Sequence, residues 1–519
     1  MASDGKNSMV GAAKPAPRGD AGADPRTVSS RSSASEPETR GGHGAPLRSM
    51  FGKDISYLVA STVQMAVSFL LTPVQTRVLH AAGYGQLSLG IALTQVASVA
   101  LCLGLHTAAQ RTYHERGGPE HARKLLTLVT ASAMVCGAGL YVSAGSWAPY
   151  IDRAPHHTAI MGEVVAWAAM TGVTVFCMAL LRSAERPALY WTLALLQGLM
   201  APLLAVILAV DASGSVSVYI DGLVIGQAVA MCLGVGAIRP QLPGRGELPT
   251  MVRDLRFGVL LVPQQVSSAL LSMGDRLVIQ RLLGSVANGR YSAAYSVGSM
   301  GIMAASMLSA AWLPRVFALR AGETESGILS ALRDHMELLA AVVTLGICVG
   351  APVLLDVWLP RGFDPSGLRM VTGIVTVSMI PYVWFLSELW ILLRSGRSGA
   401  LAVVTVVAAG ANLGLNVWLV PHLGIEGAAV ATAGSYALLA VLTRWMAGWA
   451  AVYRARPVSL WLVTVVGIGG SIGSAYLPSG GDWLAARLMT VVCCLAIVGM
   501  VVRRAREEPG TLIDPGLLS

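Results

Sequence analysis

Apolar stretches of about 20 residues, separated by short polar segments, run from residue 55 to residue 502 of the chain. This length matches the hydrocarbon core of a bilayer, which is about 30 Å thick. Backbone groups that face lipid must be paired within their own element, so the stretches predict helices. We count fourteen predicted spans, of which the seventh, carrying Asp275 and Arg276, is the least apolar. Their limits are near 55–79, 87–109, 125–149, 158–181, 188–210, 217–238, 257–280, 290–314, 335–359, 368–393, 399–420, 424–446, 458–477 and 483–502.

The composition agrees with a membrane protein, because 54% of the 519 residues are hydrophobic and only 13% are charged. An ordinary soluble domain has about 25% charged residues. The net charge is +9, but the chain has no basic run interleaved with aromatic residues, so nucleic acid is not an expected partner. The seven cysteines lie inside apolar runs without CxxC or Cys/His spacing. They are expected to be core residues, and neither a metal site nor a disulfide framework is predicted.

The two ends of the chain differ from this pattern. Residues 1–50 are rich in Ala, Gly, Ser, Pro and charge and have no periodic apolar face. Such a segment buries too little apolar surface to offset the entropy of ordering, so a disordered cytoplasmic tail is predicted. It lacks the apolar core of a signal peptide. Residues 506–519 are predicted to be a C-terminal cytoplasmic tail.

Lys and Arg positions predict the orientation, because short cytoplasmic loops are enriched in them. With the amino terminus inside, the inner segments receive 24 cations and the outer segments receive six. The bias favours an even number of spans, with both termini in the cytoplasm. The outer six are Arg77, Arg153, Arg281, Arg290, Arg361 and Arg369.

An internal repeat divides the spans into two sets of six. The segment Arg77–Ser88 recurs as Arg281–Ser292 at an offset of 204, with Arg, Leu, Gly and Ser identical at four of twelve positions. Leu181–Ser183 returns as Leu393–Ser395, and Asp221–Gly222 is echoed by Glu426–Gly427, at offsets of 212 and 205. An even number of helices per repeat relates the two lobes by an axis along the membrane normal.

The predicted fold class is therefore an all-α polytopic membrane protein, with fourteen transmembrane helices. It comprises two six-helix lobes related by a pseudo-two-fold axis and two extra C-terminal helices. The predicted boundaries are 51–246 for the first lobe, 247–450 for the second, and 451–505 for the last two helices.

Three segments carry a resemblance to a known family. Asn416–Thr432 reads NVWLVPHLGIEGAAVAT and resembles the signature of an Asn, an apolar run and P-x-x-G-I-x-G-A-A-x-A-T in polysaccharide flippases of the Wzx type. Arg77–Gly85 is similar to that family's R-x-L-G-x-x-x-Y/F-G turn. Leu255–Gly258, followed by Gly274–Arg276, Arg281 and Gly289–Tyr291, resembles its seventh helix and the turn after it. The resemblance covers residues 51–505, and the sequence departs from it at Pro263 and in the long N-terminal tail.

This resemblance implies a fourteen-helix exporter of the multidrug/oligosaccharidyl-lipid/polysaccharide (MOP) superfamily. Such a protein moves polyprenyl-diphosphate-linked glycans across the bacterial cytoplasmic membrane by alternating access, for cell-surface or exopolysaccharide assembly. A polysaccharide polymerase and glycosyltransferases are then candidate partners.

Polar side chains at helical spacing identify a candidate substrate path. In the first span, Gln64, Ser68 and Thr72 belong to a stripe on one helical face. Such a stripe lines an aqueous cavity or packs against neighbouring helices. Adding 204 to Ser61, Gln64, Ser68 and Thr72 leads to Gln265, Ser268, Ser272 and Arg276 in the seventh span.

Arg276 is the charged member of this repeated stripe. An arginine within a span costs about 2.5–3.5 kcal/mol on insertion scales and tends to face a partner or water. Asp275 is adjacent in sequence and points about 100° away around the helix. Our hypothesis is that Arg276 faces the cavity between the lobes and contacts the diphosphate, because its guanidinium matches phosphate oxygens. In the alternative, Arg276 snorkels to the outer headgroups.

Other polar residues lie within the predicted spans. Gln95 belongs to a polar stripe of the second span that also contains His106, which is either a proton site or a hydrogen-bonded packing residue. Glu388, in the tenth span, is a candidate for ion coupling together with Asp275 and His106, because buried acids mark proton or sodium relays. Alternatively, Glu388 pairs with Arg394 or Arg397.

No catalytic constellation is present in the sequence, since GxSxG, HExxH and Walker motifs are all absent. We therefore expect a non-enzymatic transporter without a cofactor, driven by H⁺, by Na⁺ or by the substrate gradient, and acting as a monomer. Two other readings stay open. A drug antiporter of the same superfamily predicts an acid in the centre of the first span, and a membrane scaffold or synthase subunit predicts no open cavity.

Overall fold

The computed structural model describes residues 45–115, 117–152, 158–318, 323–447, 458–477 and 481–507. The chain divides into two units, Met1–Met50 and Phe51–Ser519. Of the first unit, only residues 45–50, the start of a helix, are described, so the predicted tail over residues 1–50 lies almost wholly outside the described part. The predicted tail over 506–519 lies outside it from residue 508 onward.

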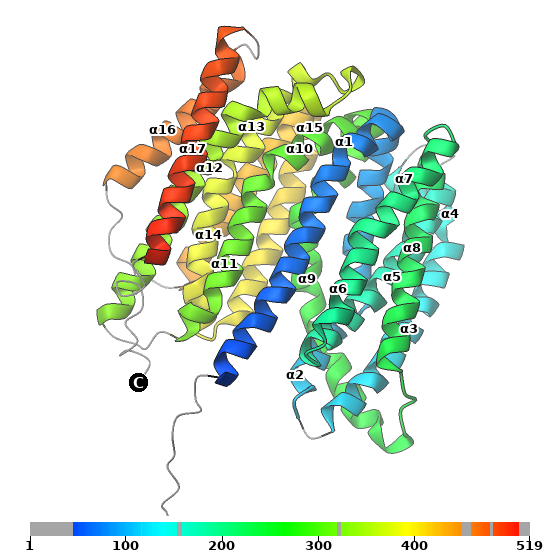
Figure 1. Ribbon diagram of the computed structural model, residues 1–519. Helices are drawn as coiled ribbons and strands as arrows, with labels where there is room; N and C mark the ends of the chain where they lie inside the picture. Colours follow the sequence, from blue (N-terminus) through cyan, green and yellow to red (C-terminus); the bar gives the residue numbers. More distant parts are fainter. Residues whose placement is uncertain are drawn as a thin grey trace, which may run out of the picture. The chain divides into compact units, whose positions relative to one another are not determined.

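The described part of the second unit consists of helices joined by short turns and contains no strand, which confirms the predicted all-α architecture (Figure 1). The first group of helices is α1 (Ala45–Leu101), α2 (Leu105–Thr112), α3 (Gly118–Val142), α4 (Ala144–Ile151), α5 (Thr158–Ser183), α6 (Pro187–Leu195), α7 (Ala201–Asp211) and α8 (Val216–Ile238). The second group is α9 (Leu248–Leu283), α10 (Ser285–Gly298), α11 (Met300–Ala318), α12 (Glu323–Trp358), α13 (Arg369–Val377), α14 (Met379–Arg394) and α15 (Ser398–Ala447). The chain continues with α16 (Val458–Tyr476) and α17 (Asp482–Glu507).

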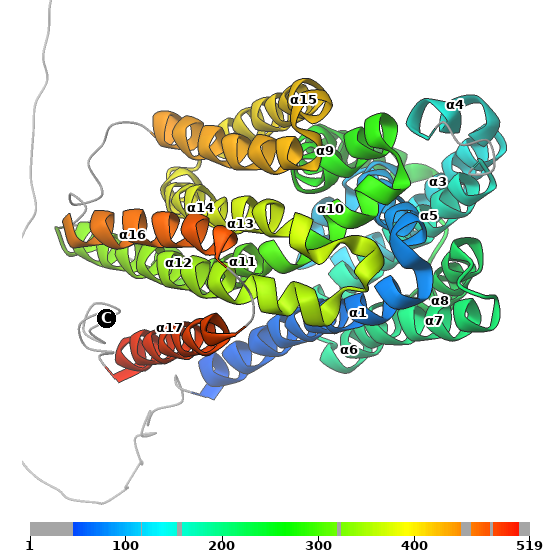
Figure 2. The same ribbon diagram turned by 90° about the horizontal axis from the view of Figure 1, so that it is seen from above.

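We call α1–α8 the N lobe and α9–α15 the C lobe, following the predicted repeat. Figure 2 shows α3–α8 on one side and α11–α14 on the other, with α16 and α17 beside α12. The lobe boundaries at residues 246 and 450 stay predictions.

Ten helical stretches in the described residues are long and apolar enough to cross a membrane, and the bent pair α10 and α11 makes an eleventh. The chain is thus a multi-pass membrane protein. The predicted number of fourteen crossings is not confirmed. Fewer helical stretches than predicted spans are found partly because α1 and α15 each contain two predicted spans. Each of these helices continues through a turn at a residue with non-helical backbone angles, His80 in α1 and Gly424 in α15.

The turns that end the first helix of each lobe have the same backbone geometry. His80 has φ 54° and ψ −177°. Gly284, which lies 204 residues later, has φ 85° and ψ −179°. Side chains rarely adopt these angles, and glycine does so readily. The flippase turn pattern quoted above has glycine at the position of His80, so this chain keeps the turn of its N lobe at a cost in backbone strain.

We call the end of the bundle that carries His80 and Gly284 the turn end, and it lies at the top of Figure 1. A core cluster at this end joins both lobes, because it contains Leu87 and Tyr219 from the N lobe and Tyr291 and Leu355 from the C lobe. Each of these side chains is at most 1% exposed. The lobes are therefore packed tightly against each other at the turn end.

Candidate functional site

The polar stripe of the first span lies on α1, where its hydroxyls are bonded to the helix itself. Ser68 is exposed, and its hydroxyl donates to the Gln64 carbonyl at 3.0 Å. Thr72 is buried and donates to the Ser68 carbonyl at 3.3 Å. Gln64 is half-buried and packs against Gly198, at which an added Cβ would lie 2.4 Å from Gln64 Cγ. Hydroxyls that donate to their own backbone keep oxygen lone pairs available for another donor.

The equivalent stripe on α9 repeats this hydrogen-bonding pattern. Ser272 is half-buried, and its hydroxyl donates to the Ser268 carbonyl at 3.1 Å, as Ser68 donates to Gln64. Ser268 is exposed and donates to the Gln264 carbonyl at 3.0 Å, while Gln265 is half-buried. At the predicted offset of 204, Ser68 and Ser272 therefore agree in residue type and in the hydrogen bond to their own helix.

Arg276 stands in α9 where Thr72 stands in α1. Its side chain is buried, and Nη1 donates to the Ser272 carbonyl at 3.3 Å, as Thr72 donates to Ser68. Nη1 also donates to Asp275 Oδ1 at 3.0 Å, which forms an ion pair. The guanidinium carbon lies 4.5 Å from the ring centroid of Tyr295, within the range of a cation–π interaction. Nη2 and Nε make no hydrogen bond to any residue that the structure describes, so two sides of the guanidinium keep free donors.

Asp275 uses both of its carboxylate oxygens. Oδ1 accepts from Arg276, and Oδ2 accepts from the hydroxyl of Tyr291 on α10. All three side chains are buried. A buried charge is tolerated when it is paired and hydrogen-bonded, and both conditions hold here. The sequence-based reasoning did not select Tyr291 or Tyr295, although their spacing of four residues places both on one face of α10.

The other candidates for ion coupling lie elsewhere. Glu388 of α14 is buried, and Arg444 Nη1 at the end of α15 donates to its Oε2 at 3.3 Å. Arg394 donates to the Val316 carbonyl at 2.5 Å, and Arg397 donates to the Met446 carbonyl at 3.1 Å. The structure thus supplies Arg444 as a partner that the sequence did not suggest.

The polar stripe of the second span is divided by a break in the helix. Gln95 is exposed on α1, whereas His106 is half-buried on α2, after positive φ angles at Leu103 and Gly104. His106 Nδ1 lies 3.9 Å from the Cys102 sulfur. Neither side chain is bonded to the Arg276 and Asp275 pair.

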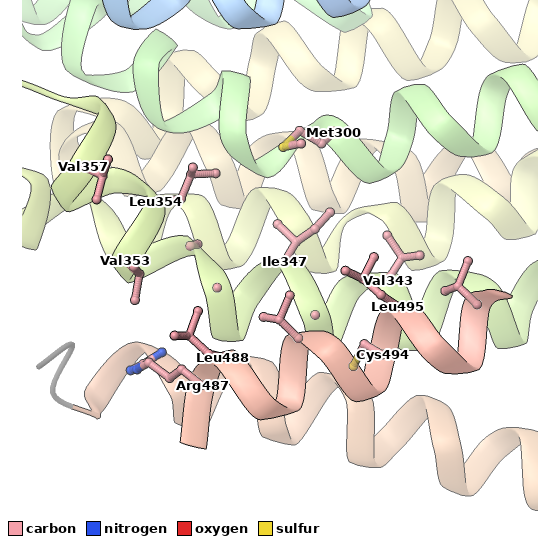
Figure 3. A pocket seen from close by; sticks show the side chains of 15 residues that line it. Met300, Val343, Ile347, Val353, Leu354, Val357, Arg487, Leu488, Cys494 and Leu495 are labelled. Atoms are coloured by element: carbon pink, nitrogen blue, oxygen red, sulfur yellow. The ribbon is translucent and has the colours of Figure 1, made fainter. Parts of the chain in front are cut away.

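An apolar cavity lies away from both polar stripes. It has a volume of about 410 Å³ and is lined by apolar residues of α12 and α17, with Met300 of α11 at one side (Figure 3). Arg487 is its one charged lining residue, and its guanidinium donates to the carbonyls of Val349, Ser474 and Leu477. These bonds fix α17 to α12 and to the end of α16. None of the candidate polar residues lines this cavity.

A second cavity of about 250 Å³ separates α2 from the first turns of α9. Charged side chains on both helices line it, including Arg111 and Arg253, and the Arg111 guanidinium carbon lies 5.0 Å from the Phe257 ring centroid. At its edge, Asp254 is hydrogen-bonded to His121 of α3 at 2.5 Å. This charged contact between the lobes was not among the predicted sites.

Comparison with known proteins identifies a matching family and several structures of similar fold. The model of the family described as "Polysaccharide biosynthesis protein" matches residues 51–319. No curated protein matches the sequence. The lipid II flippase MurJ, in an inward closed conformation, is similar in structure, with a TM-score of 0.67, 11% sequence identity, and coverage of 88% of this chain and 100% of that chain.

Two transporters of the multidrug resistance MATE family are also similar in structure. An inward-facing member of the MOP superfamily has a TM-score of 0.59 and 14% identity, covering 79% of this chain and 99% of its own. A MATE transporter from Vibrio cholerae has a TM-score of 0.52 and 15% identity, covering 77% of this chain and 95% of its own. At these identities the comparisons show that this chain shares its fold with these three proteins.

Proposed function

The chain belongs to the polysaccharide biosynthesis protein family, and from this premise we propose that it is a flippase for polyprenyl-diphosphate-linked oligosaccharide repeat units. It carries them across the bacterial cytoplasmic membrane by alternating access between its two lobes. The observation that carries the proposal is the buried Arg276 with free donors, placed on a polar stripe that both lobes repeat. One protein with the same fold is a lipid II flippase, so this fold is compatible with transport of a lipid.

The chemistry of Arg276 suits a diphosphate. A guanidinium offers up to five donors in a planar fork, and phosphate oxygens accept two of them side by side. Nη2 and Nε are the donors that make no bond within the described protein, so they are the pair we assign to the phosphate. The exposed hydroxyls of Ser68 and Ser268, together with Gln64, Gln95 and Gln265, then face the glycan. Sugar hydroxyls exchange hydrogen bonds readily with such groups.

We assign the turn end to the outer side of the membrane, with both termini in the cytoplasm. The distribution of Lys and Arg in the sequence supports this orientation. The tight packing of the lobes at the turn end then describes a state closed to the outside, in which substrate enters from the cytoplasmic side. A monomer suffices, because the two lobes already supply the interface that has to open and close.

We also assign any ion coupling to Asp275, because its carboxylate is the group bonded directly to Arg276. The alternatives, Glu388 and His106, lie in other parts of the bundle. Protonation of Asp275, or binding of Na⁺ to it, would remove the negative charge that competes with the diphosphate for the guanidinium.

An ion-coupled drug antiporter is the second candidate, since MATE transporters share the fold. The residues of the first span distinguish a flippase from a drug antiporter. An antiporter for cationic drugs needs an acid in the centre of that span, where α1 offers Gln64, Ser68 and Thr72 instead.

The proposal is tested with purified protein in liposomes that contain a fluorescent polyprenyl-diphosphate oligosaccharide, by measuring how fast the lipid becomes accessible to a membrane-impermeant quencher. Arg276→Gln should lower the rate roughly tenfold to a hundredfold, because a charge-assisted hydrogen bond contributes about 1.5–3 kcal/mol. Arg361→Gln is the matched control, because this arginine is exposed in a short 3-10 helix between α12 and α13. A folded Arg276→Gln protein with the unmodified rate would contradict the role of Arg276. Transport of a cationic dye but of no polyprenyl-diphosphate lipid by the unmodified protein would favour the antiporter.

A further inference from the structure

Equivalent residues of the two lobes touch each other at the turn end. The hydroxyls of Ser88 and Ser292 lie 2.6 Å apart, and both residues are buried. Gly85 of the N lobe meets Gly289 of the C lobe one turn earlier on the same helices. Each pair is separated by 204 residues, which is the offset of the internal repeat.

The glycine contact is reciprocal as well as close. A Cβ built on Gly85 would lie 1.9 Å from the carbonyl oxygen of Ser285, and one built on Gly289 would lie 2.0 Å from that of Ala81. Ala81 and Ser285 are themselves 204 residues apart. A residue on a two-fold axis meets its own equivalent, so the contact has to be self-complementary. Two glycines and two serines satisfy this condition, because glycines allow close approach and a hydroxyl both donates and accepts.

One arginine from each lobe also donates a hydrogen bond to a backbone carbonyl of the opposite lobe. Arg77 Nη2 donates to the Val357 carbonyl of α12 at 3.1 Å, which crosses from the N lobe to the C lobe. Its equivalent, Arg281, donates through Nη1 to the Pro149 carbonyl of α4 at 2.9 Å, which crosses in the opposite direction. Asn288 adds a bond from its side-chain nitrogen to the Gly85 carbonyl at 2.8 Å.

We propose that Arg77, Gly85 and Ser88, together with Arg281, Gly289 and Ser292, form the gate that closes the turn end of the protein. Release of these three pairs lets the site open toward that end. The proposal accounts for three of the four positions that are identical between Arg77–Ser88 and Arg281–Ser292, the fourth being the pair Leu79 and Leu283.

The gate is also connected to the proposed substrate site, and this part of the inference rests on the proposed function. Helix α10 carries the gate residues Gly289 and Ser292, and between them Tyr291, whose hydroxyl donates to Asp275. A diphosphate bound by Arg276 would compete with Asp275 for one guanidinium. The buried carboxylate would then share its cation with a second anion, which weakens the arrangement that holds α10 in place. Substrate binding thereby favours the open gate, because a ligand shifts the equilibrium toward the state that it binds better.

Cysteine cross-linking tests the gate directly. Ser88→Cys and Ser292→Cys in one chain place two thiols where the hydroxyls lie 2.6 Å apart, which is compatible with a disulfide. Oxidation of the purified protein should cross-link this double variant within the chain, and the cross-link should stop export until a reductant is added. Each single variant is a control, because the native cysteines lie outside residues 77–92 and 281–298.

Each outcome bears on the gate directly. Absence of the cross-link in a folded double variant, or normal export by the cross-linked protein, would overturn the proposal. The link to Arg276 is tested by adding Asp275→Asn, which should slow cross-linking roughly fivefold or more, as expected for a coupling of 1 kcal/mol or above. An unchanged cross-linking rate would overturn that link. Failure of the proposed function is distinguishable, because the gate would still cross-link in a protein that moves no polyprenyl-diphosphate lipid.

Discussion

One methyl group at Gly289 should separate the two lobes at the turn end. In Gly289→Ala the new Cβ would lie 2.0 Å from the Ala81 carbonyl oxygen and 3.0 Å from the Gly85 nitrogen. Both are backbone atoms of the opposite lobe, so no side chain can rotate to make room. Gly289 has a helical backbone, and alanine by itself favours the helix over glycine by about 1 kcal/mol. The substitution therefore acts on the contact between the lobes and leaves the helix intact.

The size of the effect follows from the overlap. Real Cβ atoms essentially never approach another heavy atom within 3.0 Å, so the backbones have to move apart by about 1 Å. Insertion of a methyl group into a well-packed site costs about 1–3 kcal/mol. Because this cost applies to the closed gate alone, it should shift the equilibrium toward the open state by roughly 5-fold to 150-fold.

The assay is the rate of disulfide formation between Ser88→Cys and Ser292→Cys, measured with and without Gly289→Ala. The rate should fall by the factor given above, because the thiols meet in the closed state. Gly373→Ala is the matched control, since its Cβ would have no atom within 4 Å. If folded Gly289→Ala protein cross-links as fast as its parent, then contact between Gly85 and Gly289 does not hold the gate closed.

Three further changes have distinct expected outcomes. His80→Gly should raise the free energy of unfolding by about 1 kcal/mol. It relieves a backbone conformation that costs about 1–3 kcal/mol, but part of this gain is offset because glycine loses more conformational entropy on folding. Thermal unfolding in detergent measures the change, and His80→Ala should show no gain. Arg487→Met should destabilise the protein by roughly 3 kcal/mol, because the carbonyls of Val349, Ser474 and Leu477 lose a charged donor. Arg361→Met serves as the exposed control in the same unfolding assay, and equal losses would contradict the reasoning. Hydrogen bonds from Ser366 and the Gly367 N–H, together with Arg290, hold the pKa of Asp364 below its ordinary value. The stability that Asp364 contributes is therefore present at pH values above the ordinary pKa of an aspartate. It is lost as the pH falls through the lowered pKa of Asp364. The difference in unfolding midpoint between the unmodified protein and Asp364→Asn should be present at neutral pH and vanish in acid, and a difference that persists in acid would refute this.

Much of the fold follows from local sequence, because a bilayer accepts few backbone arrangements. The helices, their approximate ends and the repeat were predictable from apolar length and from the offset of 204. The polar stripe was equally predictable, since the spacing of Gln64, Ser68 and Thr72 places them on one face of any helix. Even the change from Thr72 to Arg276 between the lobes was visible in the sequence.

The partners of the charged side chains were less predictable. A geometric estimate places Asp275 about 100° from Arg276 around the helix, yet the two are bonded, because a long guanidinium side chain can fold back toward its neighbour. Glu388 pairs with Arg444, which lies 56 residues away on another helix and could not be inferred from spacing. The number of crossings also depends on how α1 and α15 bend at His80 and Gly424.

The sequence by itself determined that this chain is a helical membrane protein with two related halves and a polar stripe in each. Periodicity and length are local properties, and they are sufficient for those conclusions. Only the tertiary structure decided which residues meet across the halves. The identity of Gly85 with Gly289 and of Ser88 with Ser292 was a weak repeat signal in the sequence, and the fold brings each pair into contact. Contacts of that kind depend on how two lobes pack against each other, which is set by many distant residues together.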